Sequence, residues 1–324
     1  MVRVLLMLLA CVLACEAAAQ PASDAGWPDK PIRLIVPFPA GSTADVVGRI
    51  LAQKLSVRLG QQVIAENRVG ASGNIGMDAL AKAAPDGYTL GLVTASTHAV
   101  APSLSANLPY DPLKDFRPIS MIGGAPYVLV AYPGLPAKTL AELIALAKAK
   151  PGTLNYGSAG PASLAHLAGA SFASLAGISI THVPYKSSAQ SVIDLMTGRL
   201  DMQFATIAPT LPNIRAGQLR ALVTTGKQRV SALPDVPTVA ESGFPDYEVT
   251  LWVAFMVPAA TPDAIAARLH SEVTTILSAP ETKEILQSHG YVAEPGPPEA
   301  LTERIRTEIA KWRDVVAKAG IRAE

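Results

Sequence analysis

Cysteine is nearly absent from this chain. Only Cys11 and Cys15 occur among its 324 residues. The rest of the chain therefore has no thiolate nucleophile, no disulfide framework and no cysteine-based metal site. The five histidines also lack the spacing of a metal motif. A chain of this length can bury enough apolar surface to be stable without cross-links, and we expect no metal site.

Charge is scarce as well. Charged residues make up 16% of the chain, and the formal net charge is +1 at pH 7. No local run of lysine and arginine creates a strongly positive segment, so we expect no nucleic-acid partner. Hydrophobic residues make up 49%, which is too many for a disordered protein and enough for two domain cores.

Catalytic sequence motifs are missing too. The chain has no G-x-S-x-G elbow, S-x-x-K pair, P-loop or H-E-x-x-H. The sequence therefore predicts a protein that is not an enzyme and uses no cofactor. One alternative stays open, because Ser158, His166 and Asp201 could converge in the folded chain as a hydrolase triad. That would make the protein a secreted Ser/His hydrolase.

The N-terminus is typical of an exported protein. Arg3 precedes an apolar stretch over 4–14, which is too short to span a bilayer. Small residues follow it, so residues 1–19 are predicted to be a signal peptide that is cleaved near Ala19. Lipid anchoring at Cys15 is the alternative.

Strand-like apolar runs alternate with helical patterns along the rest of the chain. This order predicts an α/β fold with mixed, mostly parallel sheets. The predicted strands are 32–38, 62–66, 88–94, 119–122, 127–131, 153–156, 178–183, 202–205, 219–224 and 249–257. The predicted helices are 44–59, 73–83, 139–150, 162–176, 191–197, 261–277, 280–289 and a last helix that ends at 319, with Leu301, Ile305, Ile309 and Trp312 on its inner face.

Two crossings between lobes follow from this pattern. The segment 123–126 separates two apolar runs and is predicted to be a hinge, and a second crossing is expected near 224–226. One lobe would be discontinuous, with residues 26–125 and 226–324, and the other would hold residues 126–225. The proline-rich stretch 95–118 is expected to be irregular.

Two loops rich in glycine, serine and threonine each join a predicted strand to a predicted helix. In the first, Gly41 permits close approach of a ligand to the backbone, and Ser42 and Thr43 offer hydroxyl groups. The N–H groups that begin a helix lack intrahelical partners and lie at the positive end of its dipole, so such a loop can hold an anion. Asp45 would repel an anion, so we interpret it as a cap and loop brace or as the partner of a ligand amine.

The second loop repeats this arrangement with Ser158, Gly160 and Ser163. Ordinary strand–helix turns use the same residue types, and that interpretation stays open for both loops. Other candidates lie nearby, where strands of an open α/β sheet end and ligands bind. These are His166, which would otherwise satisfy a local hydrogen bond, together with Tyr185 and Lys186, the latter otherwise a surface charge.

Eight motifs resemble those of one protein family and occur in the same order, and the resemblance covers residues 27 to 324. They are W-P-D-K-P-I-R at 27–33, V-P-F-P-A-G at 36–41 with Asp45, E-N-R-x-G at 66–70, G-N-I-G at 73–76, P-D-G-Y-T at 85–89, N-Y-G-S at 155–158 with Gly160 and His166, H-V-P-Y-K at 182–186 and P-D-V-P-T-V-A-E at 234–241. With them the chain resembles the Bug-type, TctC-like substrate-binding proteins of tripartite tricarboxylate transporters.

The resemblance implies a periplasmic receptor with the type II periplasmic binding protein fold, whose two lobes close on a small organic carboxylate. It implies delivery to membrane transporter subunits, and we expect a monomer. A sensory receptor that presents its ligand to a membrane kinase is a further alternative. Family members hold a carboxylate with the two loops, which here are Ala40, Gly41, Ser42, Thr43 and Asp45, and Ser158, Ala159, Gly160 and Ser163. The chain departs from the family at Ser42, where a glycine is usual.

Overall fold

The computed structural model describes residues 26–105, 107–161 and 163–321. The predicted signal peptide and Cys15 lie outside these ranges. Within them, no helix has both the length and the apolar character needed to cross a membrane.

Ten strands form one mixed sheet. They are β1 (Ile32–Val36), β2 (Val63–Asn67), β3 (Thr89–Thr94), β4 (Phe116–Ala131), β5 (Asn155–Ser158), β6 (Thr181–Pro184), β7 (Met202–Thr206), β8 (Arg220–Thr224), β9 (Thr250–Pro258) and β10 (Val292–Ala293). Their order is β2-β1-β3-β9-β4-β7-β5-β6, with β8 and β10 also paired to β4. The outer pairs are parallel, as predicted, whereas every pair that involves β4 or β9 is antiparallel.

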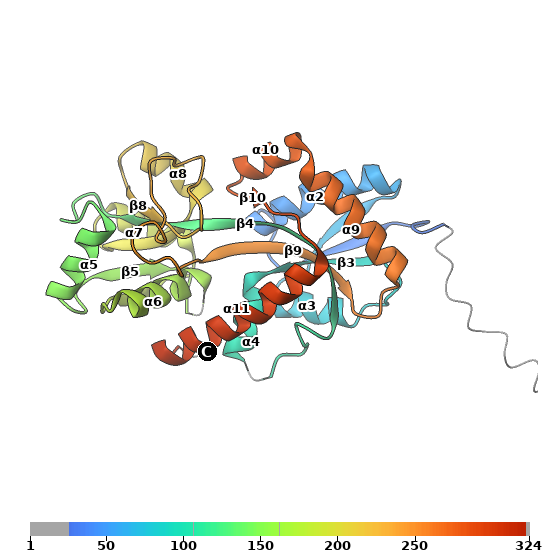
Figure 1. Ribbon diagram of the computed structural model, residues 1–324, viewed down its shortest axis with the longest axis horizontal. Helices are drawn as coiled ribbons and strands as arrows, with labels where there is room; N and C mark the ends of the chain where they lie inside the picture. The colour runs from blue at the N-terminus through green and yellow to red at the C-terminus, as the bar shows by residue number, and fades with distance from the viewer. Residues whose placement is uncertain (1–25, 106, 162, 322–324) are drawn as a thin grey trace, which may run out of the picture.

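Helices cover both ends of this sheet (Figure 1). They are α2 (Thr43–Leu59), α3 (Asn74–Ala81), α4 (Ala101–Leu104), α5 (Leu140–Ala149), α6 (Leu164–Ala176), α7 (Ser188–Met196), α8 (Ile207–Arg215), α9 (Asp263–Ser278), α10 (Pro280–Ser288) and α11 (Pro298–Ala319). The expectation of an irregular 95–118 segment was wrong at its start, where the π-helix η2 (Ser96–Val100) runs into α4. Pro102 lies in the first turn of α4.

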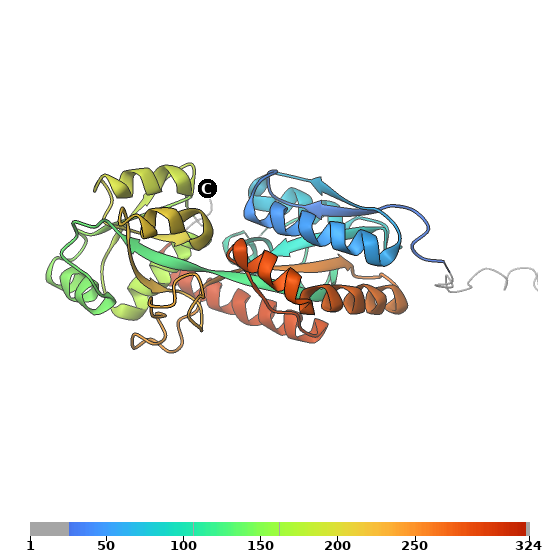
Figure 2. The ribbon, with the colours of Figure 1, turned by 90° about the horizontal axis from the view of Figure 1, so that it is seen from above.

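The elements gather in two groups, and β4 runs from one into the other (Figure 2). We call the group of β1–β3, α2, α3, α9 and α10 the first lobe, and the group of β5–β7 and α5–α8 the second lobe. The segment 123–126, predicted to be a hinge between two apolar runs, is part of the continuous strand β4, which passes from one group into the other. A Cβ on Gly123 would lie 2.2 Å from the carbonyl oxygen of Val292, so this glycine permits close strand approach instead of forming a turn.

One apolar cluster runs through both lobes, from Met77 to Phe172, and two further clusters are each confined to one lobe. Leu51 and Phe255 lie in the cluster of the first lobe. Val128 and Leu195 lie in a cluster of the second lobe that also contains Val230 and Leu233. The division into 26–125 with 226–324 and 126–225 remains a proposal, and this packing favours moving the second crossing to the start of β9.

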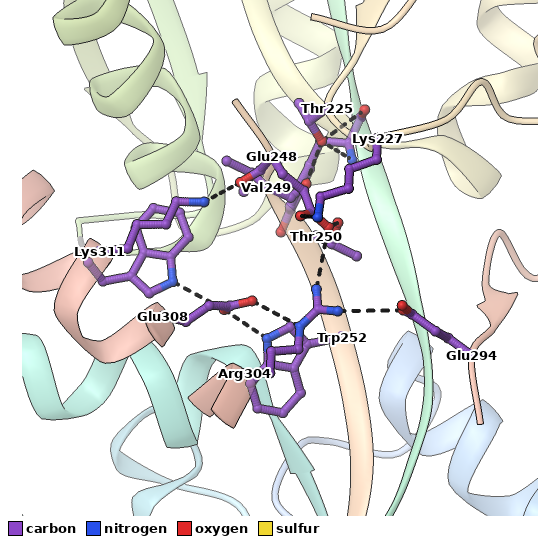
Figure 3. Close-up of polar contacts among 12 residues, drawn as sticks. Thr225, Lys227, Glu248, Val249, Thr250, Trp252, Glu294, Arg304, Glu308 and Lys311 are labelled. Atoms are coloured by element: carbon purple, nitrogen blue, oxygen red, sulfur yellow. Dashed lines mark hydrogen bonds and ion pairs between the residues drawn. The ribbon is translucent and has the colours of Figure 1, made fainter. Parts of the chain in front are cut away.

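Helix α11 lies across the junction and packs against η2, α4 and α6. Its predicted inner face is confirmed, since Leu301, Ile305 and Trp312 are buried. Arg304 on this helix forms ion pairs with Glu308 at 3.0 Å and with Glu248 and Glu294 at 3.5 Å each (Figure 3). Glu308 also accepts a hydrogen bond from Trp252 Nε1 at 2.8 Å, so one carboxylate ties α11 to β9.

Candidate functional site

The first predicted loop forms the N-terminus of α2. Ser42 is the N-cap, and its hydroxyl oxygen accepts a hydrogen bond from the Asp45 N–H at 3.2 Å. The Asp45 carboxylate accepts hydrogen bonds from the Gly41 N–H at 2.9 Å, from Arg49 Nε at 3.0 Å and from Asn67 Nδ2 at 2.7 Å. This geometry supports the interpretation of Asp45 as cap and loop brace.

Asp45 has little capacity left for a ligand amine. The residue is 2% exposed, and its carboxylate already receives three donors. Burial raises the pKa of this carboxyl, but the hydrogen bonds from Arg49, Asn67 and Gly41 outweigh burial, so the pKa lies below its usual value. The N–H groups of Gly41, Ser42 and Asp45 are also occupied by partners within the protein, so few N–H groups of this helix start can meet an anion.

We expect Asp45→Asn to lower the free energy of unfolding by about 2 kcal/mol, because hydrogen bonds to a charged group are lost in a buried position. Urea unfolding at pH 7 measures this. The exposed Asp314, which pairs with Lys318 on α11, gives a matched control, and Asp314→Asn should change stability by less than about 0.5 kcal/mol. The contribution of Asp45 is present above its unfolded pKa and is lost as pH falls through its lowered folded pKa. Equal effects of the two substitutions would contradict this role.

The second predicted loop forms the N-terminus of α6. Ser163 is the N-cap and accepts a hydrogen bond from the His166 N–H at 3.3 Å. Ser158 is fully buried, and its hydroxyl group lies 2.9 Å from the carbonyl oxygen of Gly160 and 2.7 Å from His182 Nε2. The Gly160 N–H donates to the same hydroxyl group at 3.2 Å, so Ser158 braces this loop from within.

His182 is a residue of this region that the sequence interpretation did not select. Its ring stacks on His166 with 3.7 Å between centroids and an interplanar angle of 6°. The H-V-P-Y-K motif contains His182, but only the pairing of β5 with β6 brings its ring to Ser158. The alternative triad of Ser158, His166 and Asp201 is not supported by this geometry, because Asp201 accepts from the Asn155 N–H and the Ser158 hydroxyl lies beside His182 Nε2.

Stability is expected to fall as the pH is lowered from 7.5 to 5. Burial and the neighbouring His182 lower the pKa of His166 to about 4, and burial lowers the pKa of His182 as well. An unfolded histidine protonates near pH 6.5, so acid favours the unfolded chain below that value. For His166 alone the loss at pH 5 is about 2 kcal/mol. Urea unfolding at both pH values should show a smaller fall in the free energy of unfolding for His166→Gln than for the wild type. Equal falls would contradict the role of His166 in this pH dependence.

Tyr185 and Lys186 lie at the end of β6 but differ in environment. The Tyr185 hydroxyl donates to the Asp194 carboxylate at 2.9 Å, which ties it to α7. Lys186 is exposed. The structure does not bring either side chain into the cavity described next.

A cavity of about 600 Å³ lies between the two lobes. Its described lining residues are Phe38, Ala71, Ser72, Asn74, Ser96, Val100, Ala101, Leu104, Ser105, Tyr127, Ala159, Pro161, Ser163 and Leu164. Of the predicted site residues, only Ala159 and Ser163 are in this set. Ala40, Gly41, Ser42, Thr43 and Asp45 lie on the loop just after Phe38, and Ser158, Gly160 and His166 flank the lining residues of the second lobe.

The segment at the start of α3 is a lining element that the sequence interpretation missed. Ala71 and Ser72 have φ values of +45° and +56°, a region that side-chain-bearing residues rarely occupy. Backbone strain of this kind gathers at ligand sites. A Cβ on Gly73 would lie 2.7 Å from Thr97 Cγ2, so this glycine lets the segment pack onto η2. The sequence feature that could have indicated this lining segment is the pair of glycines, Gly70 and Gly73, just after a predicted strand.

A second cavity of about 570 Å³ lies beside α11 and is lined by charged side chains, among them Lys227, Glu248, Arg304 and Glu308. These four are paired with partners in the protein (Figure 3). The cavity between the lobes is lined by the starts of α3 and α6 and by the hydroxyl groups of Ser72 and Ser96, and it is therefore the candidate site.

The comparisons with known proteins agree with this arrangement. The profile of the family described as "Tripartite tricarboxylate transporter family receptor" matches residues 47–321. Protein BugT of Bordetella pertussis is 38% identical over 317 residues, which cover 98% of this chain and 97% of BugT. An R. palustris protein solved with adipate is 35% identical with a TM-score of 0.79, over 91% of this chain and 99% of that one. MatC from Rhodopseudomonas palustris, solved with bound malate, is 30% identical with a TM-score of 0.75, over 90% and 100%.

A two-lobed α/β chain with a cavity between its lobes has the architecture of a solute-binding protein. The chain belongs to the tripartite tricarboxylate transporter receptor family, and the predicted Bug-type resemblance is confirmed.

Proposed function

We propose that this chain captures a small organic carboxylate in the cavity between its lobes. The observation that carries the proposal is the lining of this cavity. The starts of α3 and α6 reach it from opposite lobes, and Ser72 and Asn74 add side-chain donors, whereas the Ser163 hydroxyl donates to the Gly160 carbonyl. Helix starts and neutral donors favour an anion. The adipate and malate bound to the two R. palustris relatives agree with this ligand class.

The same proposal includes the cellular role. The chain would be exported, act in the periplasm as a monomer and pass its ligand to membrane transporter subunits. It would perform no catalysis. Ser158 and His182 do lie 2.7 Å apart, but Ser158 is fully buried and its oxygen already accepts from Gly160. A buried hydroxyl without access to substrate is unsuited to be a nucleophile.

A thermal-shift screen tests the proposal. Residues 20–324, freed of ligand by unfolding, dialysis and refolding, are mixed with mono-, di- and tricarboxylates, acidic amino acids and neutral analogues. A ligand at 100 times its dissociation constant should add about 2.7 kcal/mol to the free energy of unfolding. We expect the unfolding temperature to rise with a carboxylate and to stay unchanged with its amide. No shift with any acid would overturn the proposal.

A further inference from the structure

We infer that Tyr110 is a positioning residue for the cavity between the lobes, although it does not line that cavity. Its hydroxyl group holds Asn74, which does line the cavity, in one orientation and ties the start of α3 to η2. The inference rests on the proposed function and adds to it a residue that acts on binding only through another side chain.

The Tyr110 side chain is fixed by the groups packed around it. The residue is 5% exposed, and its ring meets Phe116 edge to face with 5.5 Å between centroids. His98 lies on another side of the ring, at 6.0 Å. The turn that follows is braced as well, because the Asp111 N–H donates to the Asp115 carboxylate at 2.7 Å. The hydroxyl group of Tyr110 is therefore held in a defined place.

The Tyr110 hydroxyl group joins two segments of the cavity lining. Its oxygen lies 2.9 Å from Asn74 Oδ1 and 2.8 Å from the carbonyl oxygen of Thr97. A tyrosine hydroxyl carries one proton, and both partners are acceptors, so they share it. Asn74 is the first residue of α3, and Thr97 is fully buried on η2. The hydroxyl group thus connects the lining segments 71–74 and 96–105 from behind.

The orientation of the Asn74 amide follows from this contact. Because Oδ1 accepts from Tyr110, the Nδ2 group is the part of the amide left to face the cavity. Nδ2 makes no hydrogen bond to any other residue that the structure describes. Without the Tyr110 hydroxyl, the amide is free to turn over and present its oxygen, which accepts hydrogen bonds and donates none. Tyr110 therefore keeps the donating side of Asn74 toward a bound molecule.

Tyr110→Phe tests the inference, because it removes the hydroxyl group and keeps the ring. Adipate and malate, the molecules bound to the two R. palustris relatives, are the probes. Isothermal titration calorimetry on the refolded chain should show binding of each about fivefold weaker than in the wild type, as expected for the loss of one hydrogen bond.

Tyr247→Phe is the matched control. Tyr247 is 3% exposed, and its hydroxyl group donates to the carbonyl oxygen of Ala168, in the body of α6, at 2.9 Å. The two variants lose the same kind of buried hydrogen bond, so we expect similar falls in the urea midpoint. Tyr247→Phe should change affinity by less than about twofold. Equal losses of affinity in the two variants would overturn the inference.

Asn74→Ala separates positioning from general damage to the cavity. If Tyr110 acts through Asn74, Tyr110→Phe has no further effect on affinity once the amide is gone. The double variant should then bind adipate and malate as Asn74→Ala does, within about twofold. Losses that multiply in the double variant would overturn the positioning role.

Amide hydrogen exchange of the ligand-free chain gives a readout that needs no bound molecule. Tyr110→Phe should speed exchange over 74–78 and 98–104 by about tenfold, and Tyr247→Phe should not. Unchanged exchange in both segments would overturn the inference and leave the proposed function intact. Failure of every acid to bind the wild-type chain would instead contradict the proposed function, and the exchange rates would still decide whether Tyr110 holds the two segments.

Discussion

Ala159→Glu is expected to weaken carboxylate binding by about 100-fold. Ala159 is exposed and lines the cavity beside the start of α6. A carboxylate there would meet the ligand at short range and compete for the same N–H groups. Two like charges about 4 Å apart repel by about 4 kcal/mol at an effective dielectric constant of 20. Partial solvation reduces this to about 2.7 kcal/mol, which is a factor of about 100 in the dissociation constant.

Ala159→Gln is the matched control, because it has nearly the same size without the charge. Calorimetric titration with the best carboxylate from the screen should show a loss of less than about tenfold for this variant. If the two variants lose affinity equally, steric exclusion and not charge explains the effect. If neither loses affinity, the helix start of α6 does not hold the ligand.

Arg304→Met is expected to lower the free energy of unfolding by about 3 kcal/mol. The Arg304 side chain is 21% exposed and is surrounded by Glu308, Glu248 and Glu294 (Figure 3). Its loss leaves the Glu308 carboxylate, which is 15% exposed, without its principal counter-charge. Removal of one partner from a buried ion pair costs about 3–5 kcal/mol, and partial exposure places the expected value at the lower end.

Two further variants separate this effect from general damage to α11. Arg306→Met removes an exposed arginine that pairs with Glu303 on the same helix, and it should cost less than about 0.5 kcal/mol. Addition of Glu308→Gln to Arg304→Met should recover part of the lost stability, because no uncompensated charge then remains and the amide oxygen can still accept from Trp252. Urea unfolding of the wild type, the two single variants and the double variant measures both effects. Equal costs for Arg304→Met and Arg306→Met would contradict the role of this network.

Features that depend on near neighbours in the chain were predictable. Ser42 and Ser163 cap helices, and Gly60 ends α2 with a φ of +70°. The apolar positions of α11 are buried as their spacing predicted. Each of these depends on hydrogen bonds or periodicity within one or two turns, which a sequence pattern records directly.

The parts of the site that come from distant segments were not predictable in this way. Two apolar runs proved to be one strand, because β9 and β10 both pair with β4 at Gly123 and so continue its hydrogen bonding. His182 meets Ser158 only through the register of β5 and β6. The segments 71–74 and 96–105 line the same cavity as the start of α6, although both lie far from it in the sequence.

The sequence by itself determined the helix starts and the family to which the chain belongs, because short-range hydrogen bonds and ordered motifs are properties of the chain alone. Tertiary structure decided which of the loop residues line the cavity. It also left that cavity without a charged side chain in its described lining and gave it an apolar wall. These are consequences of long-range packing, since the placement of a side chain between two lobes depends on how whole elements meet and not on the residues beside it.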